Sequence, residues 1–257
     1  MADAASGILL HGVDFSGAES GGSAKIRVVT RDLGQRSEPV RSEGRFDRRS
    51  LARAILASAQ DGRAHLWRVD APQGLPLSTI AELELPADWR AVADSMLAQG
   101  SPRHWRHSVR ERTRREPRRR CDQELHTPMA PMNLRVFKQT WSFVCELLLP
   151  LADAGVRVEP VAGPLGARVV VCEGCPASVL RAHDWPHRGY KGAGAPPAAV
   201  RGEIVRRLRA LGLAIPEPLA QEAVRDEEGD LLDALLLTTA PMHTVVPAEA
   251  IVEGWVY

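Results

Sequence analysis

The chain has 257 residues, of which 44% are hydrophobic and 25% are charged, and its formal net charge at pH 7 is +1. This composition excludes a fibrous or broadly disordered chain and suits one large globular domain or two small ones. The apolar runs are shorter than the roughly 20 residues that span a bilayer, and the first residues lack the basic region of a signal peptide. A cytoplasmic protein without membrane association is therefore expected.

The first 70 residues predict a unit rich in strands. Apolar or alternating runs that end in turn residues indicate strands, and an apolar face that repeats every three to four residues indicates a helix. We expect Ser50 to be the N-cap of the helix. The expected order is strand, strand, strand, helix, strand, over residues 7–14, 25–30, 39–46, 50–60 and 65–70.

The rest of the chain predicts a single domain, residues 1–257, that carries an insertion. Residues 75–163 have a helical and irregular pattern, with an apolar helix over about 134–151. Sheet character returns at residues 167–172, a β-branched run typical of a strand buried on both faces. Helices are expected over residues 197–211 and 230–240, and the second is apolar nearly all round and therefore buried. The fold class is α/β.

A basic segment, residues 103–120, lies inside this insertion. It contains nine arginines against two glutamates, a local charge of +7. Such a segment could follow the phosphates of a nucleic acid. A solvated helix or loop is the alternative, because only three of the 33 basic residues are lysines and arginine is favoured along the whole chain.

Four cysteines are too few and too irregularly spaced for a disulfide framework. Cys172 and Cys175 form a C-x-x-C pair, but neither a second such pair nor a histidine pair accompanies it. Buried thiols are therefore predicted in place of a zinc or redox centre.

Acidic residues stand at or near the ends of four separate predicted elements. Strand ends form the crevice where ligands bind in an α/β sheet, so such acids can converge. Carboxylates gathered in a partly dry cleft stay ionised only when a cation neutralises them, and oxygen ligands suit Mg²⁺ or Mn²⁺. Two such ions about 4 Å apart serve phosphoryl transfer. The predicted metal ligands are Asp14, Asp70, Glu173, Asp230 and Asp233.

Ordinary explanations exist for some of these residues. Asp70 precedes Ala-Pro and could make an Asx turn, and Asp230 could be only an N-cap. Asp14 and Asp233 are harder to explain in this way, because an acid beside apolar residues is costly to bury without a partner. Lys191, in a glycine-rich loop, could offset charge on a scissile phosphate or could be a surface lysine.

Seven segments, taken in order, resemble the family of unknown function 429, described as predicted RNase-H-like nucleases. The resemblance spans nearly the whole chain. Ala71, and the Gly-Cys-Pro that follows Glu173, depart from the family pattern without removing an acid. The segments are GVDFSGA (12–18), RVDAPQGLP (68–76), RRRCD (118–122), PMNLRVFKQT (131–140), VCEGCPAS (171–178), YKG (190–192) and GDLLDALLLTTA (229–240).

The resemblance implies an RNase-H-like three-layer fold, with a mixed central sheet of about five strands, helices on both faces and a helical insertion. It implies that Asp14, Asp70, Glu173 and Asp233 form the catalytic centre, with Lys191 and Arg201 near the substrate. Together with the residue patterns, it gives the catalytic candidates Asp14, Asp70, Glu173, Asp233 and Lys191, and the substrate-binding candidates Ser16, Arg118, Arg119, Arg120 and Arg201.

Three functions are compatible with these patterns. The first is a metal-dependent nuclease with nucleic acid as its partner. The second is a phosphotransferase of the actin and sugar-kinase type, because residues 14–17 with Gly21 and Gly22 resemble a phosphate-binding turn, although such enzymes generally need two domains. The third is a non-catalytic module that binds nucleic acid or protein. The oligomeric state stays open, with a homodimer as one option.

Overall fold

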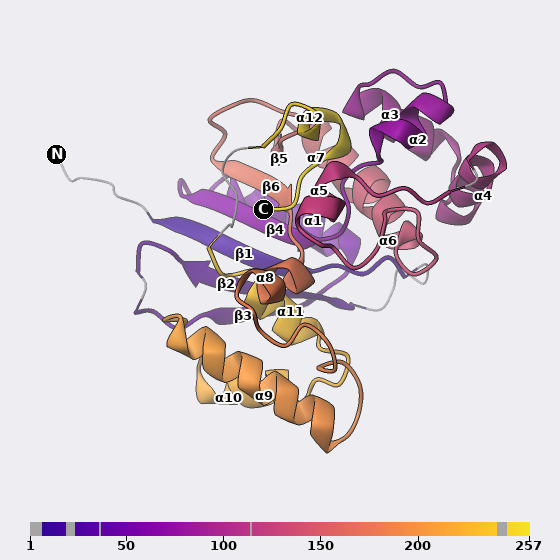
Figure 1. The fold of residues 1–257 in the computed structure, drawn as a ribbon. Helices are drawn as coiled ribbons and strands as arrows, with labels where there is room; N and C mark the ends of the chain where they lie inside the picture. Colours follow the sequence, from indigo (N-terminus) through magenta and orange to yellow (C-terminus); the bar gives the residue numbers. More distant parts are fainter. Residues whose placement is uncertain (1–6, 19–23, 36, 114, 241–245) are drawn as a thin grey trace.

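The structure, a computed structural model, describes residues 7–18, 24–35, 37–113, 115–240 and 246–257. Within these residues six strands form one sheet in the order β3-β2-β1-β4-β6-β5 (Figure 1). The first three strands along the chain pair antiparallel, whereas β1, β4, β6 and β5 pair parallel. The strands are β1 Ile8–Asp14, β2 Ile26–Asp32, β3 Arg41–Phe46, β4 Ala64–Asp70, β5 Arg157–Glu159 and β6 Val169–Glu173.

Helices cover both faces of the sheet, because each face is lined by apolar side chains that must be buried. One core joins the sheet to α1–α4, α6, η1 and α7, and a second joins the other face to α8–α11 (Figure 1). The bounds are α1 Arg48–Ser58, α2 Leu77–Glu82, α3 Trp89–Ala98, α4 Pro102–Arg112, α5 Arg120–Glu124, α6 Phe137–Ser142, η1 Phe143–Leu148 (a π-helix), α7 Leu149–Asp153, α8 Pro176–Ala182, α9 Ala195–Ala210, α10 Glu217–Arg225, α11 Asp230–Leu236 and α12 Ala250–Glu253.

The architecture is therefore α/β with a mixed sheet, as predicted. The sheet has one strand more than expected, because β5 lies inside residues 75–163 and was read as irregular. With three residues, β5 is too short to show a periodic pattern. No helix in the described part of the chain is long and apolar enough to cross a membrane.

The start of α1 differs from the prediction. The N-cap is Asp47, whose carboxylate accepts a hydrogen bond from the Ser50 backbone N–H at 2.6 Å. Ser50 is the third residue of the helix, and its hydroxyl accepts from the Asp47 backbone N–H at 3.0 Å. The prediction of Ser50 as N-cap is wrong, because two capping residues lie three positions apart and form a reciprocal capping box.

The close approach of α11 to β1 positions the residues discussed below. A Cβ atom at Gly12 would lie 2.1 Å from the carbonyl oxygen of Ala234, so only glycine fits there. Side chains alternate along a strand, so Asp14, two residues further, lies on the same face as Gly12. The first turn of α11, which carries Asp233, is thereby brought to the carboxyl end of β1.

We predict that Gly12→Ala lowers the free energy of unfolding by about 1–3 kcal/mol or more, because α11 must shift to admit the methyl group. Gly202→Ala is the matched control. Its Cβ would meet only Val224, at 4.0 Å, within a helix, so it should raise stability by roughly 0.5–1 kcal/mol. Urea denaturation measures both changes, and equal stability of Gly12→Ala and wild type would contradict the close approach.

Candidate metal centre

Three aspartates from distant parts of the chain meet at one edge of the sheet. Asp14 and Asp70 are directly paired at the carboxyl ends of the adjacent parallel strands β1 and β4, so their side chains lie on one face. Asp233, in the first turn of α11, faces them. One carboxylate oxygen from each residue lies within 4.8 Å of the others. The structure thus brings together three of the five predicted metal ligands.

Burial raises the pKa of all three carboxyl groups, and repulsion from Asp233 adds to the shift of the other two. The pKa of Asp14 lies well above its ordinary value, first because the group is buried and second because Asp233 is close. The same two causes, in the same order, raise the pKa of Asp70 to about 8. Burial also raises the pKa of Asp233, although Lys191 opposes this shift. These three carboxyl groups could hold a metal ion.

The loop that precedes α9 contacts Asp233 through two neighbouring residues. The Nζ atom of Lys191 lies 2.6 Å from Asp233 Oδ2, and the Tyr190 hydroxyl donates to Oδ1 at 2.9 Å. Lys191 is therefore at the acidic centre, where it was predicted. Tyr190 was missed, and its only signal in the sequence is its place beside Lys191.

Arg201 acts on this loop from inside the protein. Its buried guanidinium donates to the carbonyl oxygens of Tyr190, Gly192 and Val224 at 2.6, 3.0 and 2.8 Å. It does not line the cavity described below. The predicted place near substrate is therefore corrected to a place behind the loop, because these carbonyl oxygens engage the guanidinium and α9 packs it inward.

Asp230 lies one turn before Asp233 and is not among the three carboxylates that meet. It lines the same cavity, and its pKa is raised to about 6, chiefly by burial. The N-cap of α11 is Gly229, so Asp230 does not cap the helix either. The structure thus places Asp230 beside the acidic centre as the first residue of α11.

Glu173 lies on the other face of the sheet, apart from the three aspartates. It pairs with Val69, the residue before Asp70, and side chains of neighbouring positions point to opposite faces. Its two carboxylate oxygens accept hydrogen bonds from Arg119 at 2.6 Å each, and one also accepts from the Gln73 backbone N–H at 2.9 Å. Glu173 lines the cavity described below, but it is not among the three carboxylates that meet, because the strand register turns its side chain to the other face.

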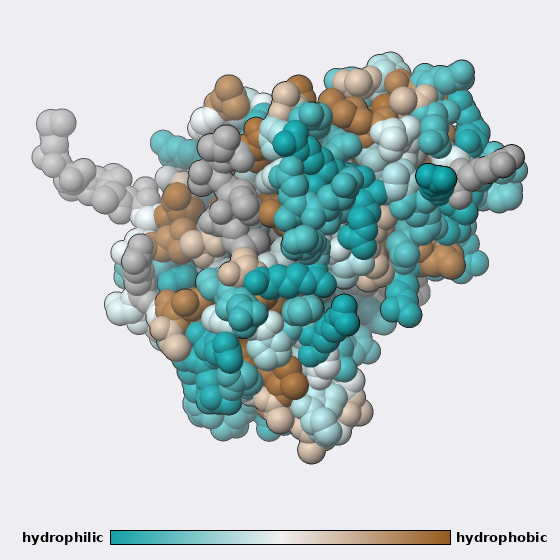
Figure 2. Space-filling model, viewed as in Figure 1, coloured by the Kyte–Doolittle hydropathy of each residue, from teal (hydrophilic) through white to brown (hydrophobic). Residues whose placement is uncertain are grey.

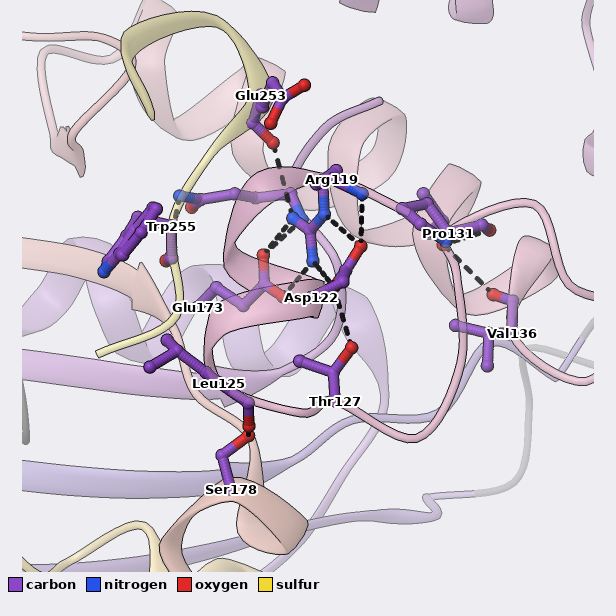
Figure 3. A network of polar contacts seen from close by, with 12 residues as sticks. Arg119, Asp122, Leu125, Thr127, Pro131, Val136, Glu173, Ser178, Glu253 and Trp255 are labelled. Atoms are coloured by element: carbon purple, nitrogen blue, oxygen red, sulfur yellow. Dashed lines mark hydrogen bonds and ion pairs between the residues drawn. The ribbon is translucent and has the colours of Figure 1, made fainter. Parts of the chain in front are cut away.

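Arg119 is the centre of a buried polar network (Figure 3). Its guanidinium bridges Glu173 and Asp122, with bonds to Asp122 at 2.9 and 3.1 Å. The Thr127 hydroxyl donates to Asp122 at 2.8 Å. These bonds engage every nitrogen of the Arg119 guanidinium. Arg119 was predicted to bind substrate; it lines the cavity described below, and its guanidinium is already engaged by the carboxylates of Glu173 and Asp122.

The neighbouring arginines of the basic segment also contact the protein. Arg118 donates to the carbonyl oxygens of Thr127 and Pro128, and Arg120 pairs with Glu124 and Glu249. Neither lines the cavity. Within α4, Arg106 pairs with Glu116 and Arg112 with Glu84. Much of the charge of the segment is thus neutralised locally, a result that the sequence alone could not show.

A cavity of about 760 Å³ opens over the three aspartates. Ser16, predicted to contact substrate, lines it, and so do Lys25, Lys138 and Lys191. These are the only lysines of the sequence. The scarcity of lysine was interpreted as compositional bias, but the fold gathers all three lysines around one cavity.

The surroundings add two observations. Hydrophilic residues cover most of the face drawn in Figure 2, and hydrophobic residues form small groups between them.

The pair Gly21 and Gly22, on which the phosphotransferase hypothesis depends, lies outside the described residues.

Comparison of the chain with protein-family models, with curated proteins and with solved structures found no match in any of the three. The resemblance to family 429 therefore stays a prediction. Any functional assignment depends on the geometry of the three aspartates and their cavity.

We predict that Asp70→Asn stabilises the metal-free protein at pH 8 but much less near pH 4. The pKa of Asp70 is about 8 in the folded chain against an ordinary 3.8. Between these values the folded chain keeps a proton that the unfolded chain has released, so rising pH favours unfolding. Asparagine removes this pH-dependent penalty.

Urea denaturation in EDTA at the two pH values measures the effect. Asp94→Asn, which breaks an exposed ion pair with Arg90 on α3, is the control and should change stability by less than about 1 kcal/mol at either pH. A loss of stability in Asp70→Asn that is equal at both pH values would contradict the raised pKa.

Proposed function

We propose that this protein is a divalent-metal-dependent nuclease with an RNase-H-like fold. The observation that carries the proposal is the meeting of Asp14, Asp70 and Asp233 within 4.8 Å, in a cavity lined by the three lysines of the chain. Carboxylate groups bind divalent metal ions, and lysine side chains beside them attract a negatively charged substrate.

The sheet supports the RNase-H-like part of the proposal. Strands β3-β2-β1-β4-β6, with β1–β3 antiparallel and β1, β4 and β6 parallel, agree with the mixed sheet of about five strands that the resemblance implies. The short strand β5 then adds a sixth member at the edge. Acids on β1, on β4 and on a helix against the sheet also agree with the expected centre, apart from Glu173.

The residues present fit Mg²⁺ or Mn²⁺. Three carboxylates with raised pKa values offer oxygen ligands at close range, and none of the atoms in the group is a thiol or an imidazole. Asp14, Asp70 and Asp233 would hold the ion. When bound, such an ion supplies an activated water and a partner for the leaving oxygen of phosphodiester hydrolysis.

Residues of the chain supply the other needs of the reaction. Lys191, with its side chain half exposed beside Asp233, is in reach of both the acids and the open cavity, so it can offset charge on the phosphate. Tyr190 orients Asp233 by its hydrogen bond. Arg201 holds the backbone of this loop and is a positioning residue.

We predict metal-dependent cleavage of labelled oligonucleotides, with single-stranded, duplex and branched substrates tested in Mg²⁺ and in Mn²⁺. Asp14→Asn and Asp233→Asn should each slow cleavage by about two orders of magnitude or more, because each removes a carboxylate that would hold the ion, and the ion would stabilise the charge that develops on the phosphate. Asp94→Asn, on the exposed surface of α3, should cleave at the wild-type rate. The proposal fails if every substrate stays intact with both ions, or if the two site variants cut as fast as wild type.

We also predict that Mg²⁺ or Mn²⁺ raises the melting temperature of the wild-type protein. An ion that binds only the folded chain, at a concentration of 100 times its Kd, stabilises it by about 2.7 kcal/mol. Asp233→Asn should lose most of this gain, whereas Asp94→Asn should keep it. Calorimetric titration gives the affinity independently of cleavage, and equal gains in all three proteins would place the metal elsewhere.

A further inference from the structure

The aspartates lie at the bottom of a recess. Asp233 is 1% exposed and Asp14 is 9% exposed, yet both line a cavity of about 760 Å³. A cavity of this size is comparable with pockets that enclose small molecules, roughly 300–1,000 Å³. A phosphate must therefore enter the recess to reach the acids.

Cations line this recess from two sides. Arg135 precedes α6 and Lys138 lies in its first turn, on one face of the sheet, and Lys25 precedes β2. Arg188 and Lys191 come from the loop after α8, on the other face. Positive charge thus lies on both sides of the aspartates. This arrangement suits an extended polyanion that has negative groups on either side of the one at the aspartates.

Three arginines of the chain have a structural role. Arg68, Arg119 and Arg201 are fully buried, and their guanidinium groups donate to carbonyl and carboxylate oxygens of the protein itself. The three lysines all line the cavity, together with Arg119, Arg135 and Arg188. An ammonium on a flexible stem follows a phosphate that changes position, whereas a guanidinium suits a fixed planar partner. The lysines therefore suit a mobile chain of phosphates.

Apolar surface completes the lining. Pro128 and Met129 contribute it from the segment before α6, and Ala177 from α8. A polarizable methionine side chain makes favourable contacts with aromatic rings without demanding one orientation. Such an apolar surface can contact the flat face of a nucleobase without distinguishing one base from another.

We propose that this cavity binds an unpaired, single-stranded stretch of nucleic acid, in which Lys25 and Lys138 hold phosphates next to the one at the aspartates. This inference rests on the proposed nuclease function. A duplex is stiff, with a persistence length of about 50 nm, and cannot bend one phosphate into a recess without distortion. A single strand has no such restriction, and its exposed bases are free to contact the apolar wall.

Salt-dependent binding in EDTA, where metal-dependent cleavage cannot occur, tests the proposal. The probes are a short labelled single strand, the same sequence as a duplex, and a mononucleotide, each followed by fluorescence anisotropy at several salt concentrations. The single strand should bind most tightly. In Lys25→Ala with Lys138→Ala, the slope of log K against log salt should become less steep by about 1.4, because each phosphate contact on a single strand contributes roughly 0.7.

Arg49→Ala with Arg53→Ala is the matched control, since it removes two exposed positive charges of α1 that do not line the cavity. Its slope should stay near that of wild type. Equal binding of duplex and single strand, equal binding of the mononucleotide, or equal slopes in the two double variants would each overturn the inference. Because no metal is present, any of these results leaves the cleavage test of the proposed function unaffected.

Discussion

Glycine at position 12 lets the backbones of β1 and α11 lie closer together than a side chain would permit. The first turn of α11 then reaches the carboxyl end of β1, and Asp233 meets Asp14 and Asp70. Every functional statement about this protein depends on that contact, because no two of these acids are near one another in the chain. The fold, and not any local motif, creates the site.

When no cation is bound, gathering these three carboxyl groups lowers the stability of the folded chain. Three carboxyl groups share one small space, burial raises the pKa of each, and repulsion from Asp233 raises the pKa of Asp14 and Asp70 further. Lys191 and Tyr190 relieve only Asp233 directly. Sites that cost stability in this way are typical of function, since a group poised to bind a cation must be unsatisfied without it.

A second group of buried charged residues lies on the other face of the sheet, and in this group each carboxylate is paired with a cation. Around Arg119, carboxylates of Asp122 and Glu173 are matched by a guanidinium, a hydroxyl and a backbone N–H (Figure 3). The same guanidinium reaches the Glu253 carbonyl oxygen, and so ties the segment that contains α12 to β6. This network joins the end of β6 to the turn that follows Asp70 at the end of β4, through the bond from the Gln73 backbone N–H to Glu173.

The sequence by itself determined the α/β class, most strands, and the acids Asp14, Asp70 and Asp233, because apolar runs and the cost of burying an acid are local properties. It could not show that Glu173 and Arg119 pair with each other. Strand register is set by pairing between distant segments, and an offset of one residue sends a side chain to the other face. Only the tertiary structure could therefore decide that Glu173 turns to Arg119 and that three scattered lysines line one cavity.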